Sequence, residues 1–189
     1  YTGGSGRRNL LQQFDESRAR LSLDSVDILY LHRWDPETPL HETFETLCDL
    51  QQSGKIRHIG VSNFAAWQVM KAAHLAAPYD LSIDILQPMY NLVKRQAEVE
   101  ILPMCADQGI AVAPYSPLGG GLLTGKYTQD QGGRLKDDPQ YAARYAQPWM
   151  HNVARSLGDL AVKTGVSPAT LAVAWVAAHP TGPGPIISA

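Results

Sequence analysis

Residues 26–63 of this 189-residue chain read as a strand, a helix and a second strand. They begin with the mostly apolar run VDILYLH at 26–32, which is typical of a strand buried on both faces of a parallel sheet. Apolar residues at helical spacing follow over Leu40–Gln52, and Gly54 stands where a helix C-cap is favoured. The run IRHIGV at 56–61 is the second strand. The segment therefore predicts a βαβ unit, whose right-handed crossover places the helix on one face of a parallel sheet.

The same alternation extends in both directions from this unit. A first helix is predicted over Asn9–Leu23, and the region from 119 to about 147 is a long Gly-, Asp- and Gln-rich loop, typical of a lid or a disordered segment. Ser167 and Pro168 suit the N-cap and first position of a late helix. The other predicted strands are 83–88, 110–115 and 185–189, and the other predicted helices are 65–77, 97–107, 150–164 and 167–178.

Two α/β architectures satisfy this alternation. A doubly wound sheet usually carries a Gly-rich turn after its first strand, and none follows His32. A (β/α)8 TIM barrel places functional residues at the carboxyl ends of successive strands, where His32, Ser62-Asn63, Gln87 and Tyr115-Ser116 stand, so the barrel is favoured. A complete barrel takes about 250 residues and eight strands. We therefore expect residues 1–189 to form one incomplete barrel domain, about strands four to eight, whose open edges make self-association possible.

The composition excludes several classes of protein. Hydrophobic residues make up 44% of the chain, and 18 acidic side chains oppose 16 basic ones for a net charge of −2, so neither nucleic acid nor an anionic membrane surface is an expected partner. No apolar run approaches the roughly 20 residues of a membrane span, and the start has no signal-like stretch, which favours a soluble cytoplasmic protein. Cys48 and Cys105 lie far apart in predicted helices, so free thiols are expected rather than a disulfide or a zinc site.

Four segments carry a resemblance to a known family. They are LHRWDP at 31–36, SGKIRHIGVSNF at 53–64, QPMYNL at 87–92 and YSPLGGGLLTGKY at 115–127. In order and spacing they closely resemble the aldo-keto reductase superfamily over nearly the whole chain, and look closer to bacterial and plant-type members and to potassium-channel β-subunits than to short-loop mammalian reductases. The resemblance implies a (β/α)8 barrel that transfers a hydride between a nicotinamide, usually NADP(H) and possibly NAD(H), and an aldehyde or ketone.

His32 matches the histidine that orients the substrate carbonyl in that family. A neutral imidazole can donate a hydrogen bond to a carbonyl oxygen and help to polarise it. The family's tyrosine acid, with its assisting lysine and aspartate, belongs to strands that this chain lacks, and neither Tyr30 nor Tyr90 lies in the segment that carries the acid. We therefore expect this chain alone to be inactive as a reductase. No metal is expected, because His32 and Asp35 have no third ligand nearby.

The cofactor residues follow from the same motifs. Ser62, Asn63 and Gln87 offer a hydroxyl and two amides for a nicotinamide carboxamide, although Ser62-Asn63 could instead cap a helix and Gln87 could simply end a strand. Tyr115 offers a flat face on which the nicotinamide ring could stack, or is an ordinary packed tyrosine. The run 116–126 predicts the pyrophosphate region, because glycines let backbone N–H groups approach phosphate oxygens. Its assigned residues are Ser116, Pro117, Leu118, Gly120 and Lys126.

Two neighbouring features allow other interpretations. Gly120 to Lys126 matches the start of a P-loop, but Tyr127 stands where a Ser or Thr should meet magnesium, so nucleotide hydrolysis is not expected. Arg134 and Lys136, on the long loop, either fold over the pyrophosphate or are solvated. Two functional alternatives to the oxidoreductase stay open: a nucleotide-binding regulatory module like a channel β-subunit, and a truncated product without function.

Overall fold

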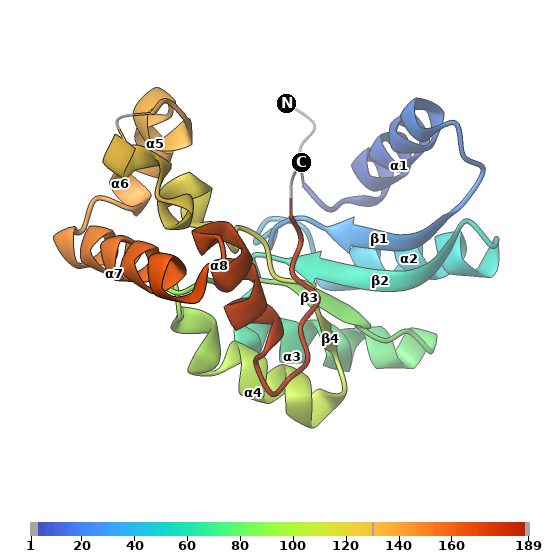
Figure 1. Cartoon of the computed structure of the whole chain (residues 1–189). Coiled ribbons are helices and arrows are strands. Elements are labelled where there is room, and N and C mark those ends of the chain that lie inside the picture. Colours follow the sequence, from blue (N-terminus) through green and yellow to red (C-terminus); the bar gives the residue numbers. More distant parts are fainter. Residues whose placement is uncertain (1–3, 130, 188–189) are drawn as a thin grey trace. The chain divides into compact units, whose positions relative to one another are not determined.

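Strand β1 (Val26–Leu31), helix α2 (Leu40–Gln52) and strand β2 (Ile56–Ser62) form the predicted βαβ unit (Figure 1). In this computed structural model, which describes residues 4–129 and 131–187, β1 and β2 are parallel, with Val26 opposite Ile56. The sheet continues through β3 (Ile85–Gln87) to β4 (Ala111–Val112) in the order β1-β2-β3-β4. An α/β fold with an open parallel sheet, as predicted for a partial barrel, is therefore confirmed.

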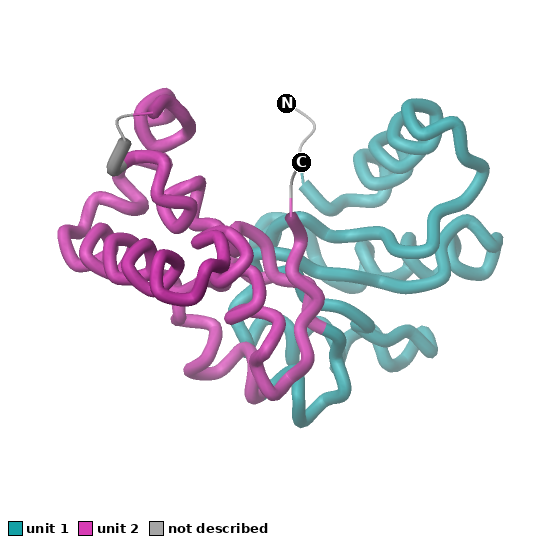
Figure 2. The backbone as a smooth tube through the Cα atoms, in the orientation of Figure 1, with its two compact units in different colours: residues 1–87, 104–111 teal, residues 88–103, 112–189 magenta. Residues whose placement is uncertain are grey.

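The chain is divided into two compact units (Figure 2). Unit 1 comprises residues 1–87 and 104–111, and unit 2 comprises residues 88–103 and 112–189. The expectation that residues 1–189 make up one incomplete barrel domain stays a prediction.

In unit 1, apolar faces of the helices are buried against the strands. Helix α2 packs on β2, and Phe44 and Leu47 of α2 are fully buried together with Ile59 and Val61 of β2. Burying an aliphatic or aromatic side chain of this size contributes about 1.5–3 kcal/mol each. Strand β1 lies at the end of the strand order, and its Ile28 is 39% exposed, as expected for an edge strand. The remaining helical segments of this unit are α1 (Arg7–Leu21), α3 (Ala66–Ala76) and η1 (Ala77–Tyr79).

Unit 2 is mainly helical. Its core gathers Leu122, Leu123, Tyr145, Met150 and Leu157, so that the Gly-rich segment and the late helices share one apolar cluster. Its helical segments are η2 (Gln96–Glu98), η3 (Gly119–Thr124), η4 (Lys126–Gln129), α5 (Arg134–Asp137), α6 (Pro139–Arg144), α7 (Pro148–Thr164) and α8 (Pro168–Ala177), and α4 (Ile101–Gln108) is divided between the units.

Four predictions of local structure were wrong. The region 119–147 carries four short helical segments rather than a continuous loop, because its apolar side chains join the core of unit 2 and Asp138 caps α6. The predicted strand 110–115 contracts to Ala111–Val112, and the predicted helix 97–107 divides into η2 and α4. Residues 185–187 are not a strand, although the Gly184 and Ile186 N–H groups donate to Val112 and Pro114. Positions 188–189 of that prediction lie outside the described residues.

The helix ends follow the sequence signals closely. Gly54 adopts a φ of +70° directly after the C-cap of α2, a conformation that costs least for glycine. Ser167 caps α8, its hydroxyl accepting the Thr170 N–H at 3.1 Å, with Pro168 at the first helical position.

We expect Ser167→Ala to lower the free energy of unfolding by about 1 kcal/mol, because the Thr170 N–H loses its acceptor at the start of α8. Urea unfolding followed by circular dichroism measures the change. The matched control is Ser156→Ala in α7, where alanine is the better helix former and stability should not fall. Equal losses in the two variants would contradict a capping role.

Two further expectations concern thiols and membranes. Both cysteines are free, and burial raises the pKa of the Cys105 thiol to about 11. Within the described residues, no one helix has the length and apolarity to cross a membrane, although α7 and α8 satisfy both criteria as a pair bent by 102°.

Candidate functional site

The carboxyl ends of three neighbouring strands hold the predicted site residues of unit 1. His32 follows β1, Ser62 ends β2 and is followed by Asn63, and Gln87 ends β3. Because the strands are parallel and in register, with Ser62 opposite Gln87, these residues share one edge of the sheet. The structure therefore brings together four of the six residues that the sequence assigned to strand ends. The other two, Tyr115 and Ser116, belong to unit 2.

Hydrogen bonds connect the three strand ends directly. Asn63 Nδ2 donates to the His32 carbonyl at 2.9 Å and to Ser62 Oγ at 3.2 Å, while Ser62 Oγ donates to the Gln87 carbonyl at 2.9 Å. Asn63 has a φ of +57°, in the left-handed region that asparagine tolerates better than most residues. Ser62 is 1% exposed, so its hydroxyl joins two strands inside the protein.

The helix-cap alternative for Ser62-Asn63 is wrong. The N-cap of α3 is Ala65, whose N–H donates to the side chain of Gln68 at 2.8 Å. The strand-end alternative for Gln87 stays open, because Gln87 ends β3 and its side chain hydrogen-bonds to Tyr30 within the protein. Burial raises the pKa of the Tyr30 hydroxyl, and the bond with Gln87 offsets part of that rise.

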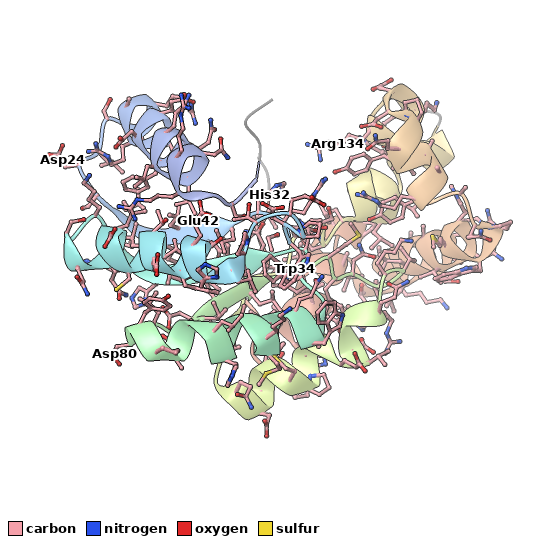
Figure 3. The ribbon with its side chains drawn as sticks, turned by 180° about the vertical axis from the view of Figure 1, so that it is seen from behind. Asp24, His32, Trp34, Glu42, Asp80 and Arg134 are labelled. Carbon is pink, nitrogen blue, oxygen red and sulfur yellow. The ribbon has the colours of Figure 1, made fainter. Side chains whose placement is uncertain are left out.

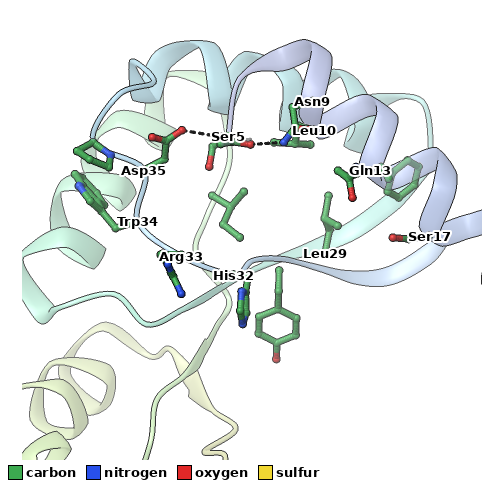
Figure 4. Close-up of a pocket in the computed structure, with 15 residues that line it drawn as sticks. Ser5, Asn9, Leu10, Gln13, Ser17, Leu29, His32, Arg33, Trp34 and Asp35 are labelled. Carbon is green, nitrogen blue, oxygen red and sulfur yellow. Dashed lines mark hydrogen bonds between the residues drawn. The ribbon is translucent and has the colours of Figure 1, made fainter. Parts of the chain in front are cut away.

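His32 is exposed and lines a cavity of about 670 Å³ between α1 and β1 (Figure 4). Apolar side chains from both elements, including Leu10, Phe14 and Leu29, form part of its wall, and in Figure 4 the imidazole points away from α1. The exposed ring is thus available to a ligand, which is the first requirement for a hydrogen-bond donor to substrate.

Asp35 organises the loop that follows His32. Its carboxylate accepts hydrogen bonds from the Thr38 hydroxyl at 2.6 Å and the Ser5 N–H at 2.7 Å, and these bonds lower the pKa of the carboxyl group. Among the described residues, no group of three or more His, Cys, Asp and Glu side chains could hold a metal ion. Trp34, in the same loop, packs against Phe64 and Trp67 beside α3.

In unit 2, the six predicted cofactor residues all line one cavity of about 460 Å³. Arg134 lines it as well and projects from the segment that carries α5 and α6 (Figure 3), whereas Lys136 does not contribute to the lining. The predicted residues that the structure brings together there are Tyr115, Ser116, Pro117, Leu118, Gly120 and Lys126.

The Gly-rich turn beneath this cavity needs glycine for two reasons. Ser116, Gly119, Gly120 and Gly121 all have positive φ, between +58° and +93°. A Cβ on Gly120 would lie 2.9 Å from the Tyr141 ring, and one on Gly121 would lie 2.6 Å from Lys126 Cε. The Gly119 and Gly121 N–H groups donate to the Ser116 and Leu118 carbonyls, so these two amides are used within the turn itself.

Two cations line the cavity, and each lies over an aromatic ring. The Lys126 ammonium is 5.1 Å from the centre of the Tyr127 ring. The Arg134 guanidinium is 5.3 Å from the centre of the Tyr141 ring and also donates to the Tyr141 hydroxyl at 3.3 Å. Stacking of this kind limits the directions in which a long cationic side chain points.

The sequence did not predict a role in this cavity region for three residues, Asn91, Tyr127 and Tyr141. Asn91 is fully buried and its Nδ2 donates to the Ser116 carbonyl at 2.8 Å, while its Oδ1 accepts the Val93 N–H. Tyr141 lines the cavity. In the sequence, Tyr127 argues only against a P-loop and has no predicted role in the site. A buried asparagine within the QPMYNL motif was the one available signal; the tyrosines lie in a region interpreted as loop. Burial raises the pKa of Tyr115, whose stacking role stays a prediction.

Comparison with known proteins identifies the family. The model of the aldo/keto reductase family matches residues 2–189. The chain is 34% identical to versiconal hemiacetal acetate reductase of Aspergillus parasiticus over 94% of its own length and 53% of that protein. It is 33% identical to L-glyceraldehyde 3-phosphate reductase of Escherichia coli K12 (93% and 53%) and 32% identical to a putative voltage-gated potassium channel subunit beta of Schizosaccharomyces pombe (95% and 54%). The chain thus spans about half the length of these relatives. Matched from residue 2 to its last residue, it belongs to the aldo/keto reductase family.

Proposed function

We propose that this chain binds NADP(H) and contributes to an oxidoreductase that interconverts aldehydes or ketones with alcohols. The observation that carries the proposal is the cavity of unit 2, which six sequence-predicted nucleotide residues line together with Arg134. When bound, the nicotinamide supplies or accepts the hydride.

The lining of this cavity fits a diphosphate. Lys126 and Arg134 supply two positive charges, and glycine at 120 and 121 lets the Tyr141 and Lys126 side chains approach the turn more closely than a Cβ would allow. Pro117, Leu118 and Ile186 add apolar walls, as ligand cavities generally have. In the proposal, Lys126 and Arg134 balance phosphate charge, and Tyr115 stacks against an aromatic ring of the nucleotide.

The strand ends of unit 1 are proposed to orient the reacting groups. Asn63 and Gln87 would hold a nicotinamide carboxamide, and Ser62, whose hydroxyl bonds to the Gln87 carbonyl, would keep the two strand ends in place. His32 would donate a hydrogen bond to the substrate carbonyl oxygen from its exposed ring. Asn63 Nδ2 also donates to the His32 carbonyl, so the same amide would hold the nicotinamide carboxamide and keep the His32 backbone in place.

The test is a titration of the 189-residue chain with NADPH and with NADH, followed by tryptophan fluorescence, with circular dichroism to verify folding. We expect saturable binding that Asn63→Ala and Gln87→Ala each weaken about 10-fold, because each loses a polar contact worth roughly 1–1.5 kcal/mol. Asn63→Gly separates loss of the amide from strain in the backbone, since glycine adopts the left-handed conformation readily and lacks the amide.

The control for these variants is Gln12→Ala on the exposed face of α1, where the side chain bonds only to Glu16 among the described contacts. It should bind NADPH as the unmodified chain does. Full affinity in Asn63→Gly would show that only the backbone shape matters, and a folded chain that ignores both nucleotides would refute the proposal.

A regulatory nucleotide-binding module is the second candidate function. Its support is the 32% identity to a putative potassium channel subunit beta. Nucleotide binding without carbonyl turnover, together with stable capture of a partner protein, would favour this module, whereas a chain without any nucleotide affinity would favour a product without function.

A further inference from the structure

The hydroxyl of Tyr127 joins two segments that line the cavity of unit 2. Tyr127 lies in η4 and donates to the Gly120 carbonyl at 3.0 Å. The same oxygen accepts the Leu135 N–H at 3.1 Å. Leu135 follows Arg134 directly in α5, so a single phenol oxygen connects the Gly-rich turn to the backbone beside the cavity's arginine.

The surroundings of this hydroxyl are packed too closely for a side chain at position 121 or 133. A Cβ on Gly133 would lie 2.8 Å from Tyr127 Oη, and one on Gly121 would lie 3.4 Å from it. Both glycines have positive φ, +143° and +93°, so their positions are unfavourable for any other residue. Lys126 stacks on the ring of Tyr127. The tyrosine thus contacts the glycine turn, the lysine and the start of α5 at once.

From these contacts we infer that Tyr127 is a positioning residue for anion binding, which ties the backbone beside Arg134 to the Gly120 turn and so holds the guanidinium where it receives a diphosphate. The inference rests on the proposed function of the cavity. Tyr127 does not itself carry charge to the ligand. It acts through Arg134, because the bond to the Leu135 N–H fixes the backbone from which the guanidinium extends, and the Tyr141 ring then fixes its direction.

The test compares the binding of inorganic pyrophosphate and of ADP by isothermal titration calorimetry. We expect Tyr127→Phe, which keeps the ring beside Lys126 and removes only the bridging oxygen, to weaken both ligands about 5- to 10-fold. The matched control is Tyr79→Phe in unit 1, whose hydroxyl donates to the exposed Glu45; it should leave both affinities unchanged.

A double-mutant cycle separates positioning from general support of the fold. In an Arg134→Ala background, Tyr127→Phe should weaken pyrophosphate less than 2-fold, because the group that it positions is gone. An undiminished 5- to 10-fold effect in that background would overturn the inference, and so would equal affinities of Tyr127→Phe and the unmodified chain.

Amide hydrogen exchange tests the bond without any variant. The Leu135 N–H should be protected in the unmodified chain, and exchange at the rate of an open amide would overturn the inference even if Tyr127→Phe fails to fold. Failure of the proposed function has a different signature, because the unmodified chain would then bind neither pyrophosphate nor ADP.

Discussion

We expect the 189-residue chain, saturated with NADPH and offered a panel of aldehydes and ketones, to oxidise the cofactor at least about 10²- to 10⁴-fold more slowly than a family member that carries the tyrosine acid. The resemblance to the family assigns only His32 of the four catalytic residues to this sequence. A hydrogen bond from His32 polarises a carbonyl, but the alkoxide that forms on hydride transfer still needs a proton from a positioned acid. We expect neither Tyr30 nor Tyr90 to supply it: Tyr30 is bonded to Gln87, and Tyr90 is 1% exposed and donates to Glu98.

Loss of absorbance at 340 nm measures this turnover, at a chain concentration where fluorescence shows the nucleotide site to be filled. The control is His32→Ala, which should leave the background rate of NADPH loss unchanged. Steady NADPH oxidation that His32→Ala abolishes would contradict the expectation and would mean that the residues of this chain already perform the chemistry.

The second large effect is expected from Gly121→Val, which should weaken NADPH binding by about 100-fold. At a φ of +93° a β-branched residue is strained by roughly 1–3 kcal/mol, and its Cβ would stand 2.6 Å from Lys126 Cε and 3.2 Å from Nζ. The chain can relieve this contact by moving the turn or by driving Lys126 from its place over Tyr127. The first change distorts the cavity wall, and the second removes a cation from it.

Gly158→Ala is the matched control for that variant. Gly158 lies within α7, has no atom within 4 Å of an added Cβ, and does not line the cavity of Gly121. Alanine there should keep the NADPH affinity and raise the free energy of unfolding by about 0.5–1 kcal/mol. Titration measures the NADPH affinity of both variants, and urea unfolding measures their stability. Unchanged binding in Gly121→Val would disprove the role given to the turn.

Prediction from sequence succeeded where the signal is local. The bounds of α2 agree with those predicted, because its apolar spacing and Gly54 act within a few residues. Ser167 and Pro168 likewise indicate where α8 begins. Among the site residues, His32, Ser62, Asn63 and Gln87 were assigned to one edge because parallel strands necessarily align their carboxyl ends.

Prediction failed where distant residues decide the outcome. The Gly-rich composition of 119–147 indicates a loop, and the region becomes helical because Leu122, Leu123 and Tyr145 are buried against α7 and α8. The roles of Asn91 and Tyr127 depend on single hydrogen bonds to the Ser116 and Gly120 carbonyls. Local periodicity does not indicate either hydrogen bond.

The sequence by itself thus determined the order of the main strands and helices from α1 to β3, the strand ends that carry His32, Asn63 and Gln87, and the family to which the motifs belong. These depend on periodicity, capping and motif spacing, which act over a few residues at a time. The tertiary structure alone decided that Arg134 lines the cavity of the Gly-rich turn and that the Tyr127 hydroxyl connects the two. A hydrogen bond or a ring contact between residues that are distant in sequence exists only when packing brings its two atoms within about 3–5 Å, and local sequence patterns do not encode that distance.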